Sequence, residues 1–446
     1  MSLPPHARTT FLDQALRWIL QPFERRLGVA TTTRLCAVAD HGASGVANIV
    51  AFATLGRTLL AMDFGAIGMM MGLHYFIVGF HRSAFVLIFS TTHHSDPESE
   101  AAHRENGTWW WMALAAAVLL SALTAGVAVI VMLLARAAPS VQWLVLPLFL
   151  TAIVTPAMLA WEFARRWLYK IDRADLVAFC SAGYFVTLCI GAWLVSQEWP
   201  SALPAALAWA AASIVAALLA LPCLRPPPPS RAIATELIRK HRGQAGWLAA
   251  TNLPYAIYST ASIVVWIGLF MGPLATAVFT AARTLTNPAI SLVSAIDSVD
   301  KPRSARALAQ EGMSGLRRIV RRSRALIAVV TGLYLGLVGI FAGPLTGLVF
   351  DGSYPGLESE VRLLATGFFL FGLNLPSETM LIVLQAGRTM LVIRCITATF
   401  TIAALAIGSA YGVDGMAVGF AATQILNFIL LVTGERWVLS RREGLA

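Results

Sequence analysis

Charged residues are scarce in this 446-residue chain. Asp, Glu, Lys and Arg together make up 13% of the sequence, whereas 57% of the residues are hydrophobic and the mean hydropathy is +0.71. Soluble domains contain about 25% charged residues, so this number is too small for a water-facing surface of this size. The deficit excludes a secreted domain, a cytosolic enzyme and a nucleic-acid-binding protein. The long apolar stretches indicate an all-α, polytopic membrane protein.

Cysteine pairs and catalytic signatures are also lacking. The five cysteines lie in apolar stretches and form no C-x-x-C pair, which argues against disulfides, metal binding and redox chemistry. No Walker A pattern, nucleophile elbow or H-E-x-x-H motif occurs. The polar cluster at 93–98 has no second cluster that would complete a metal site. We therefore predict no enzyme, no metal and no cofactor.

Lysine is rare as well, since only 3 of the 33 basic residues are Lys, and this composition is typical of a bacterium with a GC-rich genome. Of these 33 residues, 29 lie in the N-terminal segment, the C-terminal tail and alternate connections between the apolar stretches. If both termini are cytoplasmic, every connection obeys the positive-inside rule. We predict a multi-pass protein of the bacterial inner membrane with both termini in the cytoplasm.

Twelve spans of about 20 residues or more are predicted, the length that a ~30 Å hydrocarbon core requires. They are expected at 35–57, 64–89, 108–135, 141–164, 175–196, 202–224, 244–270, 274–298, 325–350, 361–384, 390–411 and 414–435.

The two halves of the chain resemble each other. A shift of 220 residues places Phe149, Leu150 and Pro156 on Phe369, Leu370 and Pro376. We therefore expect two pseudo-symmetric six-helix bundles around a central cavity. The predicted parts are a cytoplasmic amphipathic segment at 1–34, a first bundle at 35–224, a Pro-rich and basic linker at 225–243, a second bundle at 244–435 and a cytoplasmic tail at 436–446.

Two segments outside the spans have apolar residues at helical spacing opposite basic ones. The first is 1–34, and the second is 300–324, where Leu316 and Val320 alternate with arginines. This pattern predicts amphipathic helices on the inner leaflet, held by anionic lipid.

Polar and ionisable residues gather in the first, second, seventh and eighth spans, and each ionisable one costs about 2.5–3.5 kcal/mol on insertion scales. These four spans are therefore predicted to face the cavity. The candidate substrate-binding residues are Arg283, Arg57, Arg82, His74, Asn48, Asn252, Tyr255 and Asn287.

Arg283 is the strongest candidate, because it lies about nine residues inside its predicted span. A guanidinium suits phosphate or diphosphate oxygens. The alternative is an ion pair with Asp40 or Asp297, or a bond to carbonyls freed near Pro288. A shift of 209 residues places His74 opposite Arg283 in the other half.

The remaining ionisable candidates have two readings each. Arg57 and Arg82 lie near span ends, where they either contact substrate or anchor the helix at the interface. Asp40, His41 and Asp297 either couple transport to a proton or sodium gradient or form charge pairs. Glu162 is expected to form a pair at the helix surface with Arg165 or Arg166. Glu378 is expected either to form such a surface pair or to face the cavity.

The opening spans resemble those of polysaccharide flippases in the multidrug/oligosaccharidyl-lipid/polysaccharide (MOP) superfamily. The resemblance is carried by Ser44-Gly45, Asn48, Leu55-Gly56-Arg57, Asp63-Phe64-Gly65, Gly68, Ala281-Ala282-Arg283 and Gly412 to Ala417.

This resemblance implies a flippase that moves undecaprenyl-diphosphate-linked oligosaccharide from the cytoplasmic to the periplasmic leaflet by alternating access. Cationic cavity residues would hold the diphosphate, and the product would serve surface polysaccharide or exopolysaccharide synthesis. The expected partners are the lipid-linked oligosaccharide, membrane lipids and a polysaccharide polymerase or export machinery. The alternatives are a multidrug exporter of the same fold and a major-facilitator-type exporter of small molecules.

Overall fold

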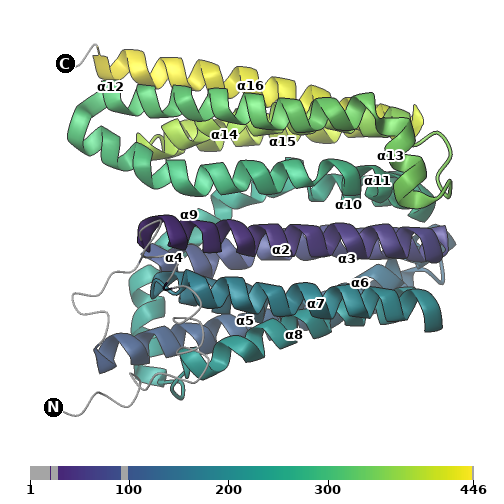
Figure 1. Cartoon of the computed structure of the whole chain (residues 1–446), viewed down its shortest axis with the longest axis horizontal. Helices are drawn as coiled ribbons and strands as arrows, with labels where there is room; N and C mark the ends of the chain where they lie inside the picture. Colours follow the sequence, from purple (N-terminus) through teal and green to yellow (C-terminus); the bar gives the residue numbers. More distant parts are fainter. Residues whose placement is uncertain (1–20, 22–28, 92–98, 444–446) are drawn as a thin grey trace. The chain divides into compact units, whose positions relative to one another are not determined.

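The computed structural model describes residues 21, 29–91 and 99–443. Most of the predicted amphipathic segment 1–34, and the polar cluster at 93–98, lie outside these residues. The regular elements of the described chain are all helices, which confirms the predicted all-α class (Figure 1). Most are long and apolar, because a chain in a bilayer must satisfy its backbone hydrogen bonds internally.

The first half of the chain forms helices close to the predicted spans. A π-helical turn, Arg82–Val86, joins α3 to α4, and a 3-10 turn, Pro139–Leu144, precedes α6. The helices are α2 (Val29–Thr58), α3 (Ala61–His81), α4 (Leu87–Thr91), α5 (Glu100–Leu134), α6 (Val145–Lys170), α7 (Ala174–Glu198) and α8 (Ala202–Leu224).

The second half is more broken. A bend of 55° separates α9 from α10 where a single span is predicted. The predicted span 274–298 is divided between α11 and the start of α12, and α12 itself is two helices joined across a kink at Gly312, which has a φ of 67°. The helices are α9 (Arg231–Tyr258), α10 (Ser262–Met271), α11 (Pro273–Thr286), α12 (Pro288–Ile340), α13 (Ala342–Phe350), α14 (Glu358–Val383), α15 (Gly387–Ser409) and α16 (Gly412–Glu443).

Ten helices in the described residues are long and apolar enough to cross a membrane, or eleven when the bent pair α9 and α10 counts as one span. The chain is thus a multi-pass membrane protein. The shortfall from twelve arises at 274–298, where Pro288 begins a new helix and leaves two pieces that are each too short to span.

The chain folds as two compact units. The first comprises residues 1–51 and 77–249, and the second comprises residues 52–76 and 250–446. The C-terminal end of α2 and most of α3 therefore belong to the second unit. The predicted division at the linker 225–243 stays a prediction.

The same pattern of helix packing occurs in each unit. In the first unit α6 packs against α5 and α8, and α7 packs against α8. In the second unit α14 packs against α12 and α16, and α15 packs against α16 (Figure 1). Pro156 lies inside α6 and Pro376 inside α14, as the 220-residue shift predicts. The predicted pseudo-symmetry of the halves is confirmed at the level of the fold.

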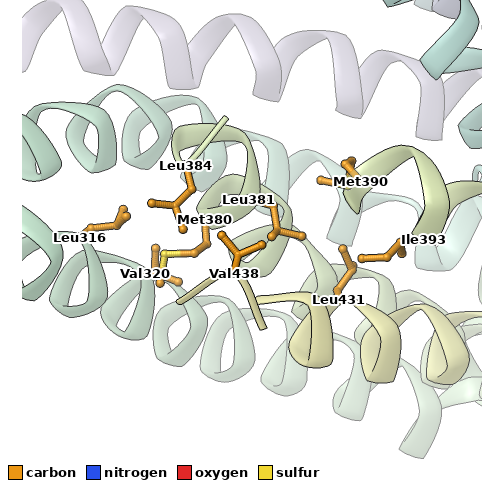
Figure 2. Close-up of a cluster of buried hydrophobic side chains, with 9 residues drawn as sticks. All are labelled: Leu316, Val320, Met380, Leu381, Leu384, Met390, Ile393, Leu431 and Val438. Carbon is orange, nitrogen blue, oxygen red and sulfur yellow. The ribbon is translucent and has the colours of Figure 1, made fainter. Parts of the chain in front are cut away.

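The segment 300–324 is not an amphipathic helix with its apolar face on lipid. Leu316 and Val320 are buried and pack with residues of α14, α15 and α16 (Figure 2). Figure 2 shows both side chains lying beside Met380, with Val438 of α16 close by. The prediction was wrong because the part of α12 that follows the kink at Gly312 places its apolar face in the protein core.

The Pro-rich linker is docked on the start of α5. The Trp111 indole donates a hydrogen bond to the Pro227 carbonyl at 2.8 Å, and the His103 Nε2 atom lies 3.2 Å from the Arg225 carbonyl. Gly107 accommodates the Pro227 ring, since a Cβ at this position would collide with it. The linker residues just before α9 are therefore part of the first unit's packed surface.

Three glycines let α3 approach α10 and α11 closely within the second unit. A Cβ added at Gly65 would collide with the Pro273 carbonyl, and one at Gly68 would collide with the Thr280 side chain. At Gly72 a Cβ would lie 3.0 Å from Val265. Small residues at helix interfaces allow the van der Waals contact that drives helix association in membranes.

We expect Gly65→Ala to destabilise the protein by about 1–3 kcal/mol, because the added methyl meets a backbone carbonyl that cannot rotate away. Gly126→Ala in α5 is the matched control, since a Cβ there meets no atom within 4 Å. The measurement is the thermal unfolding midpoint of each purified variant in one detergent. Equal midpoints for the two variants would contradict the packing described here.

Candidate functional site

Asp40 is fully buried in α2 and has donors on both carboxylate oxygens. Arg165 donates to Oδ2 from Nε at 2.8 Å and from Nη2 at 2.5 Å, and the Tyr169 hydroxyl donates to the same oxygen at 2.6 Å. The Ser181 hydroxyl donates to Oδ1 at 2.5 Å. His41 lies beside this pair, with Nδ1 3.2 Å from Arg165 Nη2. The carboxylate is thus held in a buried pair with Arg165, which favours charge pairing over ion coupling.

Glu162 is the centre of a second group of charges in the first unit. Its Oε1 atom lies 2.7 Å from Arg82 Nη2 and 3.1 Å from Arg166 Nε, and its Oε2 atom lies 3.9 Å from Arg165 Nη1. The expected pair with Arg166 is present. The expected surface setting is wrong, because the side chain of Glu162 is only 14% exposed. Arg82 is thereby engaged in an ion pair within the protein.

Asn48 is held by other parts of the first unit. Its Nδ2 donates to the Ser44 carbonyl at 2.9 Å, and its Oδ1 accepts a hydrogen bond from the Trp209 indole at 2.9 Å. The amide group joins α2 to α8, so this contact favours a structural role.

Arg57 caps the end of α13. Its Nε donates to the Val349 carbonyl at 2.5 Å, and its Nη2 donates to the Leu348 carbonyl. A cation at a helix C-terminus satisfies free carbonyls and is favoured by the helix dipole. In the turn after α13, Tyr354 packs against Phe64 and Phe350, and burial raises the pKa of its phenol to about 12. These contacts favour the anchoring role of Arg57 over substrate binding.

Arg283 lies near the end of α11, and no hydrogen bond or ion pair to its guanidinium is formed by the described residues. Its Nε is buried and lacks an acceptor. The nearest favourable contact is the ring of Tyr75, whose centre lies 6.0 Å from Arg283 Cζ. This distance is the outer limit of a cation–π interaction.

The surroundings of Arg283 are apolar or already satisfied. Ala281 and Ala282 are fully buried, and the Thr284 hydroxyl donates to the Thr280 carbonyl of its own helix. The Tyr334 hydroxyl donates a hydrogen bond of 2.7 Å to the Leu285 carbonyl, near the break before α12. The guanidinium therefore lies on the short helix α11 without a compensating anion among the described residues.

The other predicted residues near α11 lie as follows. His74 is buried on α3, and its ring centre is 5.9 Å from that of Tyr75, so its neighbour on the chain contacts Arg283. Asn287 lies half-buried at the junction of α11 and α12. Residues 52–76 group with the second unit, and thus His74 and Arg283 belong to the same unit.

Asp297 is paired with other residues of the second unit. Its Oδ2 lies 2.5 Å from Lys301 Nζ, and its Oδ1 accepts a hydrogen bond from Thr379 at 2.9 Å. Neither carboxylate considered as a partner of Arg283 is free for that role, because Asp40 is bound by Arg165 and Asp297 by Lys301.

Tyr255 and Asn252 lie on α9, and Tyr255 contacts Arg394 of α15. Arg394 Cζ is 5.0 Å from the centre of the Tyr255 ring, and Arg394 Nη2 is 4.0 Å from Glu378 Oε2. The Asn252 Nδ2 is buried and has no hydrogen-bond acceptor among the described residues.

Sequence reasoning missed the roles of Arg165 and Arg394 for different reasons. The fourth span is predicted to end at 164, whereas α6 continues to Lys170 and places Arg165 inside the helix. Arg394 lies inside the predicted span 390–411, but its contacts are with α9 and α14, and no local pattern predicts them. An Arg within two turns of a span end is the signal that could have marked both residues as candidates. The described residues contain no group of three or more His, Cys, Asp or Glu side chains that could hold a metal ion.

Solved structures of transporters share this fold. An inward-facing multidrug resistance MATE family transporter of the MOP superfamily matches with a TM-score of 0.56 and 17% identity over 93% of this chain and 95% of that one. The lipid II flippase MurJ in an inward closed conformation matches with a TM-score of 0.65 and 10% identity over 90% and 87%. A MATE structure in the bent conformation matches at 0.55 and 15% over 98% and 99%.

At these identities the likeness defines the fold alone, which is that of MATE transporters and MurJ. No protein-family model matches the sequence, and neither does any curated protein.

We expect Asp40→Asn to destabilise the protein by about 3–5 kcal/mol, because it leaves Arg165 buried without its anion. The double variant Asp40→Asn/Arg165→Gln should be less destabilised than the sum of the two single variants. Thermal unfolding midpoints of the purified proteins measure both effects. Arg104→Gln, which breaks an exposed pair with Glu100, is the control and should shift the midpoint little.

If Asp40 couples transport to an ion gradient instead, Asp40→Asn should not destabilise the protein. Asp40→Asn would then unfold at the wild-type temperature, and transport would lose its dependence on the ion gradient. That pair of results would overturn the structural role assigned to Asp40.

Proposed function

We propose that this chain is a MOP-type flippase that moves a lipid-linked oligosaccharide carrying a diphosphate from the cytoplasmic to the periplasmic leaflet. The fold shared with MATE transporters and MurJ supports transport, and MurJ is a lipid II flippase. The chain offers no catalytic constellation in its described residues and is proposed to act as a transporter, not an enzyme.

The observation that carries this proposal is the uncompensated guanidinium of Arg283. A buried cation without an anion is costly, and a structure retains one where a ligand supplies the missing charge. A diphosphate bears about two negative charges and cannot cross the apolar interior unpaired. Arg283 offers it a planar fork of donors, and the Tyr75 ring supports the cation from one side.

A multidrug exporter is the second candidate, because MATE transporters share the fold. A site for cationic drugs needs an unpaired carboxylate. Asp40, Glu162, Asp297, Glu378 and Glu435 each have a basic partner within 4.0 Å. The guanidinium of Arg283 has no such partner among the described residues, and its sign favours an anionic cargo.

The remaining parts of the proposal follow from the substrate. The protein is proposed to lie in the bacterial inner membrane with both termini in the cytoplasm. Membrane lipids and a polysaccharide polymerase or export machinery are its proposed partners. Asp40 and Asp297 form charge pairs, and the proposal therefore assigns them no role in coupling to a proton or sodium gradient.

The test is mass spectrometry of lipid extracts from a deletion strain, together with analysis of its surface polysaccharide. We expect diphosphate-linked oligosaccharide to accumulate and the surface glycan to be lost. Complementation with Arg283→Gln should fail at normal protein levels, while Arg283→Lys should restore transport in part, because it keeps the charge but loses the fork. Arg136→Gln, an exposed arginine, is the control and should complement fully.

Normal glycan with no accumulated lipid would refute the flippase proposal. Drug sensitivity of the deletion strain would then be the evidence for the multidrug exporter. Full complementation by a well-expressed Arg283→Gln protein would remove Arg283 from the mechanism.

A further inference from the structure

A second group of residues in the second unit has the features of an anion site. Arg394 of α15 lies over the Tyr255 ring of α9, with Cζ 5.0 Å from the ring centre. Its Nη1 donates to the Thr251 carbonyl at 3.3 Å, and its Nη2 lies 4.0 Å from Glu378 Oε2 on α14. The side chains of Arg394 and Glu378 are 16% and 13% exposed, so both are largely removed from solvent.

The ion pair between Arg394 and Glu378 is looser than two other pairs inside this protein, Arg165 with Asp40 and Arg324 with Glu435. Arg165 contacts Asp40 at 2.5 Å and Arg324 contacts Glu435 at 2.9 Å, whereas the atoms of Arg394 and Glu378 stay 4.0 Å apart. Charge-assisted hydrogen bonds are normally about 2.7–2.9 Å long. The carboxylate of Glu378 thus neutralises Arg394 without forming a hydrogen bond to it.

Three buried groups of α9 and α15 have no hydrogen-bond partner among the described residues. They are Arg394 Nε, Asn252 Nδ2 and the Tyr258 hydroxyl. A buried donor left without an acceptor is destabilising, so a ligand that supplies acceptors would be bound favourably. A group with several acceptor oxygens and a negative charge is suited to these donors.

We infer that Arg394, Asn252 and Tyr255 form a second anion-binding site that takes a phosphate oxyanion, and that Glu378 is the counter-ion which this anion displaces. The inference deepens the proposed function, because the diphosphate of the cargo is one source of the oxyanion. The headgroup of an anionic phospholipid is the other source. Both present the same oxygens to the guanidinium.

An exchangeable counter-ion is useful because a guanidinium inside the membrane is costly when no anion is bound to it. An unpaired guanidinium inside the membrane is expensive, and a tightly bonded one cannot release its partner for a ligand. A carboxylate at 4.0 Å lowers the electrostatic cost of the buried guanidinium, yet it is held loosely enough to be displaced by a ligand. The Tyr255 ring holds the guanidinium plane from one side through a cation–π contact.

The position of the site fits loading of the cargo. Glu378 lies five residues before α14 ends at Val383, and Arg394 lies seven residues after α15 begins at Gly387 (Figure 1). At 1.5 Å per residue both lie about 10 Å or less from those helix ends. In the proposed orientation these ends are cytoplasmic, where the diphosphate would arrive.

A purely structural ion pair and an exchangeable one predict opposite effects of removing Glu378 on anion binding. If the pair only stabilises the fold, removing either partner harms the protein in the same direction. If Glu378 competes with a bound anion, Glu378→Gln should strengthen anion binding while Arg394→Gln weakens it.

The experiment measures binding of radiolabelled farnesyl diphosphate to the full-length protein in phosphatidylcholine nanodiscs. We expect the Kd to rise about tenfold in Arg394→Gln and to fall several-fold in Glu378→Gln. Arg394→Lys keeps the charge and should be intermediate, which guards against a folding defect in the Gln variant. Arg388→Gln, an exposed arginine on the same helix, should bind as the wild type does.

Competition with phosphatidylglycerol identifies the source of the oxyanion. Competition that disappears in Arg394→Gln assigns the site to the lipid headgroup, and its absence assigns the site to the cargo. Wild-type binding by Arg394→Gln, or weaker binding by Glu378→Gln, overturns the inference.

The failure of the proposed function can be told apart from the failure of this inference. If Arg283→Gln weakens binding and Arg394→Gln does not, the inference fails alone. If the wild type binds phosphatidylglycerol through Arg394 but no farnesyl diphosphate, the proposed function fails alone. If the wild type binds neither probe, both fail.

Discussion

The cost of a charge in the membrane interior is the constraint on which this structure depends. In the first unit that cost is offset by short contacts, such as those that Arg165, Tyr169 and Ser181 make to Asp40. These contacts join α2 to α6 and α7, and they fix where three helices meet. The same constraint makes Arg283 conspicuous, because no described residue offers its guanidinium an anion.

The two units repeat a packing pattern and differ in their charges. The pairing of α5 with α6 and of α6 with α8 corresponds to that of α12 with α14 and of α14 with α16. Yet Asp40 of the first unit is held in a tight pair, while the second unit contains an unpaired Arg283 and a loose pair at Arg394. Duplication of one fold followed by divergence of its polar residues accounts for both observations.

The fold was largely predictable from sequence, because span length and the pattern of basic residues follow directly from the thickness and polarity of a bilayer. The helix breaks were harder, since Pro254 and Pro288 are equally visible in the sequence, while α9 continues through Pro254 and a new helix begins at Pro288. The partner of Asp40 lies 125 residues away, and no local pattern predicts such a contact. The role of 300–324 depended on whether lipid or α14 to α16 covers its apolar face, and only tertiary packing decides that.

The docking of Pro227 against Gly107 has a consequence for how the chain can change in evolution. Surface connections usually tolerate insertions, because each doubling of a flexible loop costs only about 0.6 kcal/mol. Here the connection is fixed at Pro227 and helix α9 begins at Arg231, so only residues 228–230 separate the anchored residue from the helix. An inserted residue would rotate the start of α9 relative to its anchor. The junction between the halves is therefore a spacer of fixed length, and sequences with this arrangement should vary less in length here than in their other connections.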